Sequence, residues 1–151
     1  MAEQRERHEQ FSTVRHYPST RTEVWAAWSI REKKAAWLRN SELQLDFRVG
    51  GKEHSEFTDG NDRHVNDTYF FEITELERIV LAYSMAKNDR VHSVSLATIT
   101  FEDHEGGTRF TYNEQMCILP PSDGVEGRTH GWDILLDMLG ESVWEAGIIG
   151  A

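Results

Sequence analysis

The sequence has a single cysteine, Cys117, and no apolar run that approaches the roughly 18 residues of a membrane-spanning helix. A lone cysteine forms no intramolecular disulfide and favours a reducing compartment. Cys117 lies in a strand-like run, where the role of a small buried hydrophobe is favoured over that of a nucleophile. The N-terminal residues are charged and lack the apolar core of a signal peptide. We therefore expect a cytoplasmic protein without a membrane segment.

Basic residues are also scarce. The chain has 16 Lys and Arg against 26 Asp and Glu, which gives a formal net charge of -10. Negative charge of this size repels nucleic-acid phosphates and anionic membrane surfaces, and no basic cluster with interleaved aromatic residues occurs. We therefore expect neither a nucleic acid nor a membrane as a partner.

The usual motifs of cofactor and nucleophile chemistry are missing too. The sequence contains no Walker loop, dinucleotide fingerprint or nucleophile elbow, because Gly50-Gly51 and Gly106-Gly107 stand between strand-like segments. The seven histidines show no convergent spacing of metal ligands. We expect no cofactor and no metal, and the sequence favours a binding protein over an enzyme.

The chain does have many aromatic residues and a long helical pattern. The pattern covers Gly127 to Ala146, where apolar residues recur at the spacing of one helix face. These residues are Trp132, Leu135, Leu136, Leu139, Val143 and Ala146. A weaker strip, Ile134 with Met138, lies on the far side and could face solvent, loops or another subunit. The main strip must be covered, and the β-like segments that precede it are the obvious partner.

The rest of the chain predicts strands and two short helices. We expect residues 1–9 to form a mobile tail that becomes a strand over Gln10 to Tyr17. Capping boxes at Thr20 and Ser29 then predict two short helices. Helices of this length are marginal alone, so packing must hold them, and three tryptophans are available for it: Trp25, Trp28 and Trp37.

From Glu42 onward the apolar pattern has a period of two. One strand is predicted over residues 42–49, where the alternating apolar residues are Leu43, Leu45, Phe47 and Val49. Another is predicted over about Val65 to Glu75, with Phe70 on one parity and three apolar residues on the other: Tyr69, Phe71 and Ile73. Hairpin turns separate the strands and no βαβ spacing appears, which favours an antiparallel sheet.

The sequence therefore predicts a single α+β domain over residues 1–151. Its fold is a curved antiparallel sheet of about seven strands wrapped around a long C-terminal helix, with two short helices after the first strand. A sheet of this size curls strongly. A helix in the curl can contact the sheet at its ends and stand off in the middle, which would leave a cavity.

Glu114 is the most informative polar residue. It shares the strand parity of Phe110, Tyr112 and Met116, which places a carboxylate on the apolar face. Such a group is either a cavity acid that anchors a ligand, or a carboxylate that pairs with an arginine or with the helix and only orders the fold.

Three other polar residues are candidates. Tyr83 and Tyr112 bring hydroxyl groups to apolar parities, which favours core tyrosines, although a cavity would use both. His54 has the opposite parity to Phe57. It is exposed if Phe57 packs inward, and it lines a cavity mouth if the strand bulges.

The order of the elements and several short stretches resemble the START-like, or helix-grip, superfamily, which includes the birch-pollen-allergen-like (SRPBCC) proteins. Within it, the chain is most similar to the bacterial proteins named after the activator of heat-shock-protein-90 ATPase. The stretches that carry the resemblance are Tyr17-Pro18 before Val24-Trp25, residues 45–53, 77–80, 93–98 and 107–115, and His130-Gly131-Trp132. The resemblance implies the fold, but the superfamily includes lipid and hormone binders, cyclases, aromatases, oxygenase subunits and chaperone activators.

Our first hypothesis is a protein that binds a small hydrophobic or aromatic ligand between the sheet and the C-terminal helix. The residues expected to line the cavity are Glu114, Tyr112, Phe110, Tyr83, Trp132, Leu136, Leu139 and His54. One alternative is a protein-interaction module of the chaperone ATPase-activator type, with a chaperone or a second copy as partner through the Ile134 strip. Another is a cofactor-independent cyclase- or hydrolase-like enzyme that uses Glu114, for which the sequence names no second titratable group.

Overall fold

The computed structural model describes residues 5–120, 122 and 124–150, with residues 145–150 described by their backbone. Seven antiparallel strands form one sheet in the order β1-β7-β6-β5-β4-β3-β2. The elements are β1 (Arg7–Tyr17), α1 (Arg21–Ser29), α2 (Arg31–Leu38), β2 (Gln44–Leu45), β3 (Lys52–Asp59), β4 (Asp62–Thr74), β5 (Arg78–Lys87), β6 (Arg90–His104), β7 (Gly107–Ile118) and α3 (Gly124–Gly150). The predicted α+β helix-grip fold is confirmed.

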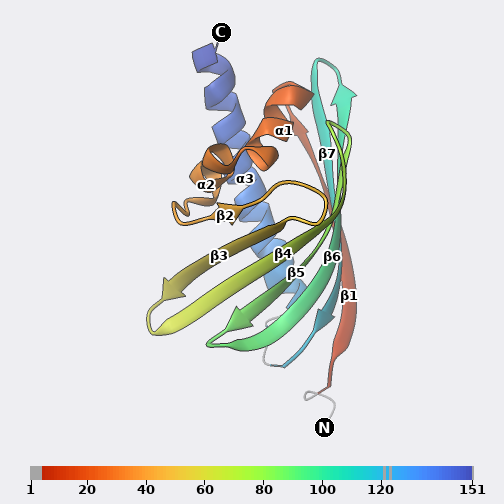
Figure 1. Ribbon diagram of the computed structural model, residues 1–151. Helices are drawn as coiled ribbons and strands as arrows, with labels where there is room; N and C mark the ends of the chain where they lie inside the picture. The colour runs from red at the N-terminus through yellow and green to blue at the C-terminus, as the bar shows by residue number, and fades with distance from the viewer. Residues whose placement is uncertain (1–4, 121, 123, 151) are drawn as a thin grey trace.

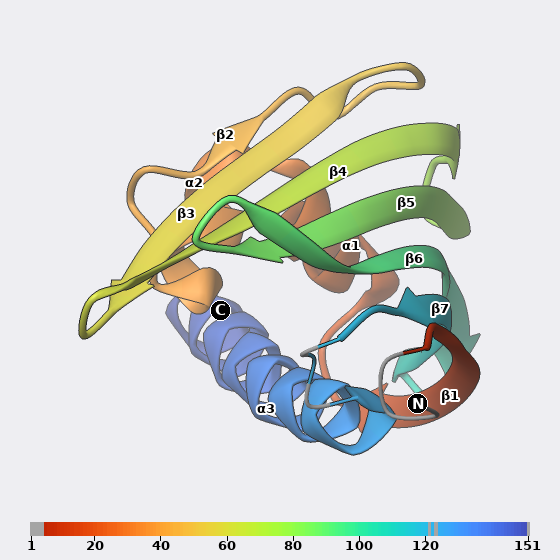
Figure 2. The same cartoon turned by 90° about the horizontal axis from the view of Figure 1, so that it is seen from below.

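The sheet curls around α3, and α1 and α2 lie on the same side of it (Figure 1). Figure 2 shows α3 inside the curl, beside β1. We call the face toward the helices the inner face and the opposite face the outer face. Two side chains of β1 fasten α3 there: Arg15 pairs with Asp133 and Asp137, and the Tyr17 hydroxyl donates to the carbonyl oxygen of Leu136 at 2.8 Å.

Several predicted boundaries shift. The expected tail of residues 1–9 is too long, because Arg7 to Glu9 already pair with β7. Helix α3 extends beyond the predicted Gly127 to Ala146 at both ends. The capping box at Thr20 is present, with its hydroxyl accepting from the Glu23 amide at 3.2 Å. The one at Ser29 is not, because Ser29 ends α1 and Ile30 caps α2 without a side-chain hydrogen bond.

The strand predicted over residues 42–49 is mostly a turn. Only Gln44 and Leu45 pair with β3. The chain then folds back so tightly that a Cβ atom at Gly51 would lie 2.0 Å from the carbonyl oxygen of Asp46. The turn delivers Phe47 into the core, where its ring meets Trp25 and Phe70 with centroid distances of 5.7 and 5.2 Å. Phe47 therefore packs against the aromatic core from a turn and does not belong to the predicted strand.

A β-bulge in β4 changes the predicted faces. The register shifts between Phe70 and Glu72, so Phe71 is the extra residue and is 55% exposed. Beyond the bulge, Ile73 pairs with Ile79, whose side chain lies in the core. Ile73 thus joins Phe70 on the inner side, and its predicted grouping with Tyr69 and Phe71 is wrong because the alternation is interrupted.

Aromatic rings join the helices to the sheet. Trp25, Trp28 and Trp37 are all buried, as their role in holding α1 and α2 requires. Trp28 stacks on Phe110 of β7, and Trp37 donates from Nε1 to the carbonyl oxygen of Ala27 at 2.7 Å. Within the described residues, no helix is long and apolar enough to cross a membrane.

Phe70→Ala should lower the free energy of unfolding by about 3–5 kcal/mol, because it removes a fully buried ring from the core. Phe71→Ala is the neighbouring control and should cost less than about 1 kcal/mol, because its ring projects from the bulge. Urea unfolding of both variants measures the difference. Equal losses would contradict the assignment of these two rings to opposite sides.

Candidate functional site

Glu114 projects from β7 onto the inner face, where its side chain is completely buried. Its carboxylate accepts four hydrogen bonds. Tyr83 and Tyr112 donate their hydroxyls to Oε1 at 2.6 and 2.7 Å. Ser95 Oγ and Arg128 Nη1 donate to Oε2 at 2.6 and 2.8 Å. We call these five residues the Glu114 cluster.

Arg128 comes from the first turns of α3 and ties the helix to the sheet. Besides Glu114, its guanidinium donates to the Tyr83 hydroxyl at 2.8 Å and, through Nη2, to Ser93 Oγ at 2.5 Å. Its Cζ also lies 5.4 Å from the centroid of the Tyr83 ring. Arg128 and Glu114 therefore form a buried, charge-assisted contact in which the guanidinium is the direct counter-ion of the carboxylate.

The electrostatics keep the two phenols and the guanidinium of the cluster protonated. Burial raises the pKa of Tyr83 and Tyr112 well above that of a free phenol, and the nearby Glu114 carboxylate raises both further. Burial acts to lower the pKa of Arg128, but Tyr83 and Glu114 outweigh it, so that the net shift is upward. The phenols therefore remain hydrogen-bond donors and the guanidinium remains charged.

Trp132 extends the cluster with a half-buried aromatic surface. It lies one turn after Arg128, and its ring centroid is 4.3 Å from that of Tyr112 and 6.1 Å from that of Trp28. Its Nε1 donates to the Tyr83 hydroxyl at 3.3 Å. A polar cluster and a partly exposed indole thus stand side by side under the first turns of α3.

The inner face changes character along the strands. In the cross-strand row of Glu114, Ala97, Leu81 and Phe70 follow on β6, β5 and β4 and form part of the apolar core. The next two rows toward the start of α3 are mostly polar: Glu53, Thr68, Tyr83 and Ser95, then Ser55, Asn66, Met85 and Ser93. The cluster therefore lies at the boundary between an apolar and a hydroxyl-rich surface.

A second buried ion pair lies at the other end of the polar row. Lys34 of α2 meets Glu53 of β3 with an Nζ to Oε1 distance of 2.5 Å, and both side chains are buried. The ammonium also lies 4.5 Å from the centroid of the Trp28 ring. A helix residue thus neutralises the strand carboxylate at the β3 end of this row, as Arg128 neutralises Glu114 in the neighbouring row.

The expected apolar lining is buried more tightly than a cavity allows. Phe110, Leu136 and Leu139 have no surface accessible to water. A side chain of this kind borders no water-sized void, so α3 does not stand off from the sheet at these three residues. Of the expected lining, Glu114, Tyr83, Tyr112 and Trp132 do come together.

His54 is not part of this site, because it lies on the outer face. Its Nδ1 is 2.5 Å from Asp67 Oδ1, and its Nε2 is 2.8 Å from Glu56 Oε2. The hydrogen bonds to Glu56 and Asp67 raise the pKa of His54. Phe57 is on the inner side, which corresponds to the alternative in which His54 is exposed. The ring of Phe57 is itself half exposed and stacks on the ring of His64.

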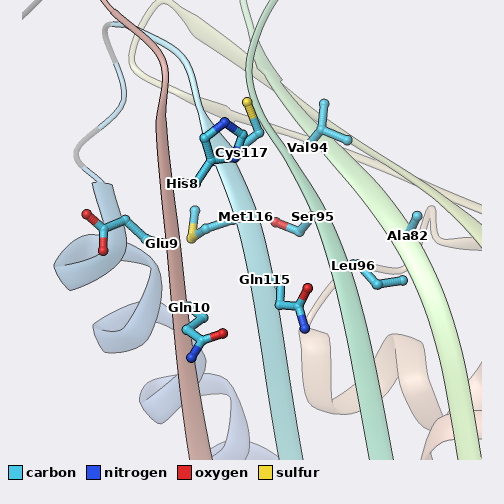
Figure 3. A pocket seen from close by; sticks show the side chains of 10 residues that line it. All are labelled: His8, Glu9, Gln10, Ala82, Val94, Ser95, Leu96, Gln115, Met116 and Cys117. Carbon is cyan, nitrogen blue, oxygen red and sulfur yellow. The ribbon is translucent and has the colours of Figure 1, made fainter.

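Two adjoining hollows lie on the outer face. One, of about 600 Å³, is bordered by side chains of β1, β5, β6 and β7, which Figure 3 shows from close by. The other, of about 650 Å³, is bordered by residues of β2 to β6. Ala82 and Val94 border both. These hollows are on the far side of the sheet from α3.

The hydrogen bonds of Glu114 limit what its carboxylate can do chemically. All the favourable acceptor positions of Glu114 already receive donors, so none is free to accept a substrate proton while the cluster is intact. Among the described residues, no group of three or more His, Cys, Asp or Glu side chains is placed to hold a metal ion.

Arg128 was absent from the residues that the sequence singled out, although it carries a signal. It is the only lysine or arginine between Gly127 and Ala146, and it precedes Trp132 by four residues. Residues spaced by four share a helix face, so the two point to the same strip. The partner of an inward Glu114 could have been sought there.

Comparison with known proteins gives a family and a fold. A family model described as Activator of Hsp90 ATPase homolog 1-like protein matches residues 18–143. None of the curated proteins matches the chain significantly.

Solved structures give the same picture. An uncharacterised protein from Rhizobium leguminosarum is 30% identical, with 93% of this chain and 97% of that chain covered and a TM-score of 0.89. The Mll3558 protein from Rhizobium loti is 32% identical, with 91% and 99% covered and a TM-score of 0.87. DynU16, a protein of the dynemicin biosynthetic locus, shares the fold at 17% identity, with 87% and 46% covered and a TM-score of 0.67.

Arg128→Met should lower the free energy of unfolding by about 3–5 kcal/mol, because it leaves the Glu114 carboxylate buried without a counter-ion. The double variant with Glu114→Gln should cost less than the sum of the two single changes, since it removes both charges. Arg15→Met is the control on the other side of α3 and should cost about 1 kcal/mol, because Asp133 and Asp137 are exposed. Chemical denaturation of the four variants measures these losses of unfolding free energy. If the losses of the two single variants simply added up in the double variant, the ion pair would not contribute to stability.

Proposed function

The chain belongs to the family of activator of Hsp90 ATPase homolog 1-like proteins, and from that premise we propose that it binds a small hydrophobic or aromatic molecule under the first turns of α3. The observation that carries this proposal is the contact between the Glu114 cluster and the half-buried ring of Trp132. Ligand sites commonly combine apolar surface with a few fixed polar groups. The hydroxyl-rich rows beside the cluster supply such groups on rigid strands.

The bound molecule would lie against the partly exposed part of the inner face. Trp132 and Leu135 of α3 and Met85 of β5 supply apolar surface there, and Asn66 of β4 supplies an amide. The charges of Glu114 and Arg128 neutralise each other. A neutral ligand with hydroxyl or carbonyl groups therefore suits the site better than an anion, which the net charge of -10 would also repel.

Deeper binding would require α3 to move. The helix is fastened along β1 by Arg15 and Tyr17 and at its start by Arg128. Phe110, Leu136 and Leu139 become available to a ligand only when the start of α3 swings away from β5 and β6. Release of the Arg128 contacts is the step that such an opening needs first.

Binding can be tested with the neutral fluorescent probe phenylnaphthylamine. We expect its emission to rise on addition of the protein, and the melting temperature to rise with probe concentration, because a ligand of the native state stabilises it. Trp132→Leu should weaken binding at least about 10-fold, because it removes the aromatic wall of the site. Small aromatic ketones and phenols that displace the probe would then define the ligand class.

Trp144→Leu is the matched control for this experiment. Trp144 lies on the same helix, is 52% exposed and contacts none of the residues of the Glu114 cluster in the described hydrogen bonds and ring contacts. Its variant should bind the probe like the unchanged protein. If both variants lose the probe equally, or if the unchanged protein leaves the probe dark, the site is elsewhere or does not exist.

The second candidate function is that of a protein-interaction module for a chaperone of the Hsp90 class. The family description supports it, and so does Ile134, which is 49% exposed on the outward strip of α3 beside the half-buried Met138. The enzymatic alternative is less well supported, because Glu114 has no free acceptor position for a substrate proton. A cytoplasmic location fits both binding roles and stays a prediction.

A chaperone ATPase assay separates the second candidate from the first. If the strip serves a chaperone, saturating protein should stimulate hydrolysis of ATP, and Ile134→Asp should abolish the effect, because a charge cannot be buried at an apolar contact. Val14→Asp, at an equally exposed apolar residue on the outer face of β1, is the control and should leave stimulation intact. Absence of stimulation by the unchanged protein would count against this role.

A further inference from the structure

Three hydrogen-bonding side chains stand together on the inner face of β3 and β4, beside the proposed ligand surface. They are Ser55, Asn66 and Thr68, and we call them the polar strip. Ser55 pairs with Asn66 across the two strands, and Thr68 follows Asn66 on the same face of β4. Ser55 and Asn66 are half-buried, whereas Thr68 is buried. A ligand that lies across the inner face from β6 to β3 therefore meets these three side chains.

Most of the hydrogen-bonding capacity of the polar strip is unused. The Thr68 hydroxyl donates to Asn66 Oδ1 at 3.3 Å. Within the described residues, the Ser55 hydroxyl and Asn66 Nδ2 have no hydrogen-bond partner. The amide nitrogen offers two donors, and the oxygens of Ser55 and Thr68 offer acceptor positions. Water satisfies groups of this kind as long as they are open to solvent.

A purely apolar molecule would cover the polar strip at a loss. It would remove water from an amide and two hydroxyls without replacing their hydrogen bonds, and each such loss weakens binding. A site that is built to bond a hydroxyl group discriminates strongly against analogues that lack it. A ligand that covers the strip must therefore carry several hydrogen-bonding groups on the edge that faces β3 and β4.

These groups of the ligand should be uncharged. The row of Thr68 ends at Glu53, whose carboxylate is 2.5 Å from the ammonium of Lys34. In the neighbouring row, Arg128 neutralises Glu114. An ionic group would find no unpaired charge of opposite sign in either ion pair, and its burial costs more than that of a hydroxyl group.

Aromatic rings border the polar strip on two sides. On the next row of β3 and β4, Phe57 stacks on His64 with a centroid distance of 4.6 Å, and Phe57 is 53% exposed. On the other side, Trp132 of α3 donates to the Tyr83 hydroxyl of β5 at 3.3 Å. A sugar ring has hydroxyl groups at its edge and C–H groups on its faces, which pack against aromatic rings. This surrounding therefore suits a sugar better than a single phenol.

The span of the sheet fits an aromatic group joined to a sugar. From β6 to β3 there are three strand spacings of about 4.8 Å, or about 14 Å in total. The aromatic group would lie under Trp132 against β5 and β6, and the sugar would lie on the polar strip. We propose that the ligand is a neutral glycoside of an aromatic alcohol, bound through its sugar hydroxyls by the polar strip. This inference rests on the proposed function, because both concern the same site.

Displacement of phenylnaphthylamine by naphthol and by its β-glucoside and β-galactoside tests the proposal. At least one glycoside should bind the unchanged protein about 10-fold more tightly than naphthol, although the sugar makes it more soluble in water. The double variant Ser55→Ala/Asn66→Leu should weaken that glycoside about 10-fold and leave naphthol within about 2-fold. Both positions are half-buried, so an unchanged melting temperature would show that the variant folds.

Thr98→Val is the matched control, since Thr98 carries a half-buried hydroxyl on the outer face of β6. It should keep the preference for the glycoside. The proposal is overturned if neither glycoside binds more tightly than naphthol, or if the preference survives in the double variant. In both cases the proposed function stands as long as phenylnaphthylamine and naphthol bind and Trp132→Leu releases them. If the unchanged protein binds none of the compounds, the proposed function and this inference fail together.

Discussion

The buried contact between Glu114 and Arg128 is the constraint on which the arrangement of this molecule depends. A carboxylate without partners could not stay on the inner face, because burial of an unpaired charge costs several kcal/mol. The cluster meets this cost with donors from β5, β6, β7 and α3. The start of α3 is consequently fixed against the strands that carry the hydroxyl-rich surface, and Trp132 is held against the ring of Tyr112.

Two buried ion pairs on neighbouring cross-strand rows give the inner face its order. Lys34 reaches Glu53 from α2, and Arg128 reaches Glu114 from α3. From Glu53 the row continues through Thr68, Tyr83 and Ser95, which carry hydroxyl groups. The apolar core thus ends at a defined level, and the proposed ligand surface begins there. The same strands border two hollows on their other face, so the sheet separates the proposed ligand surface from a second, differently shaped one.

Much of the fold could be predicted from the sequence, because local patterns of residues determine the order of the elements. Period-two alternation, the capping box at Thr20 and the long apolar strip of α3 are properties of neighbouring residues. The parity of Glu114 was also local, and it placed the carboxylate correctly on the apolar face. The β4 bulge was not predictable in this way, since alternation on either side of it looks regular and only pairing with β5 reveals the shift at Phe71.

The site was less accessible to sequence reasoning because its contacts join distant parts of the chain. Parity tells which face a residue takes but not its level along the sheet, so the meeting of Tyr83, Ser95 and Glu114 depends on register. Arg128 depends in addition on how far α3 slides along the strands. His54 is a further case. Its parity left two positions open, exposure or a cavity mouth, and only the structure places it on the outer face with Asp67 and Glu56 as its partners.

The pairing of the first strand with the last has a consequence for folding during synthesis. The ribosome synthesises β1 before the other strands of the sheet, but its pairing partner β7 follows only after β2 to β6. Tyr17, for example, cannot pair until Thr108 has been synthesised. Closing so long a loop costs chain entropy and delays folding. The central hairpins can assemble while β1 is still unpaired, and β1 pairs with β7 and contacts α3 only after these later segments have been synthesised.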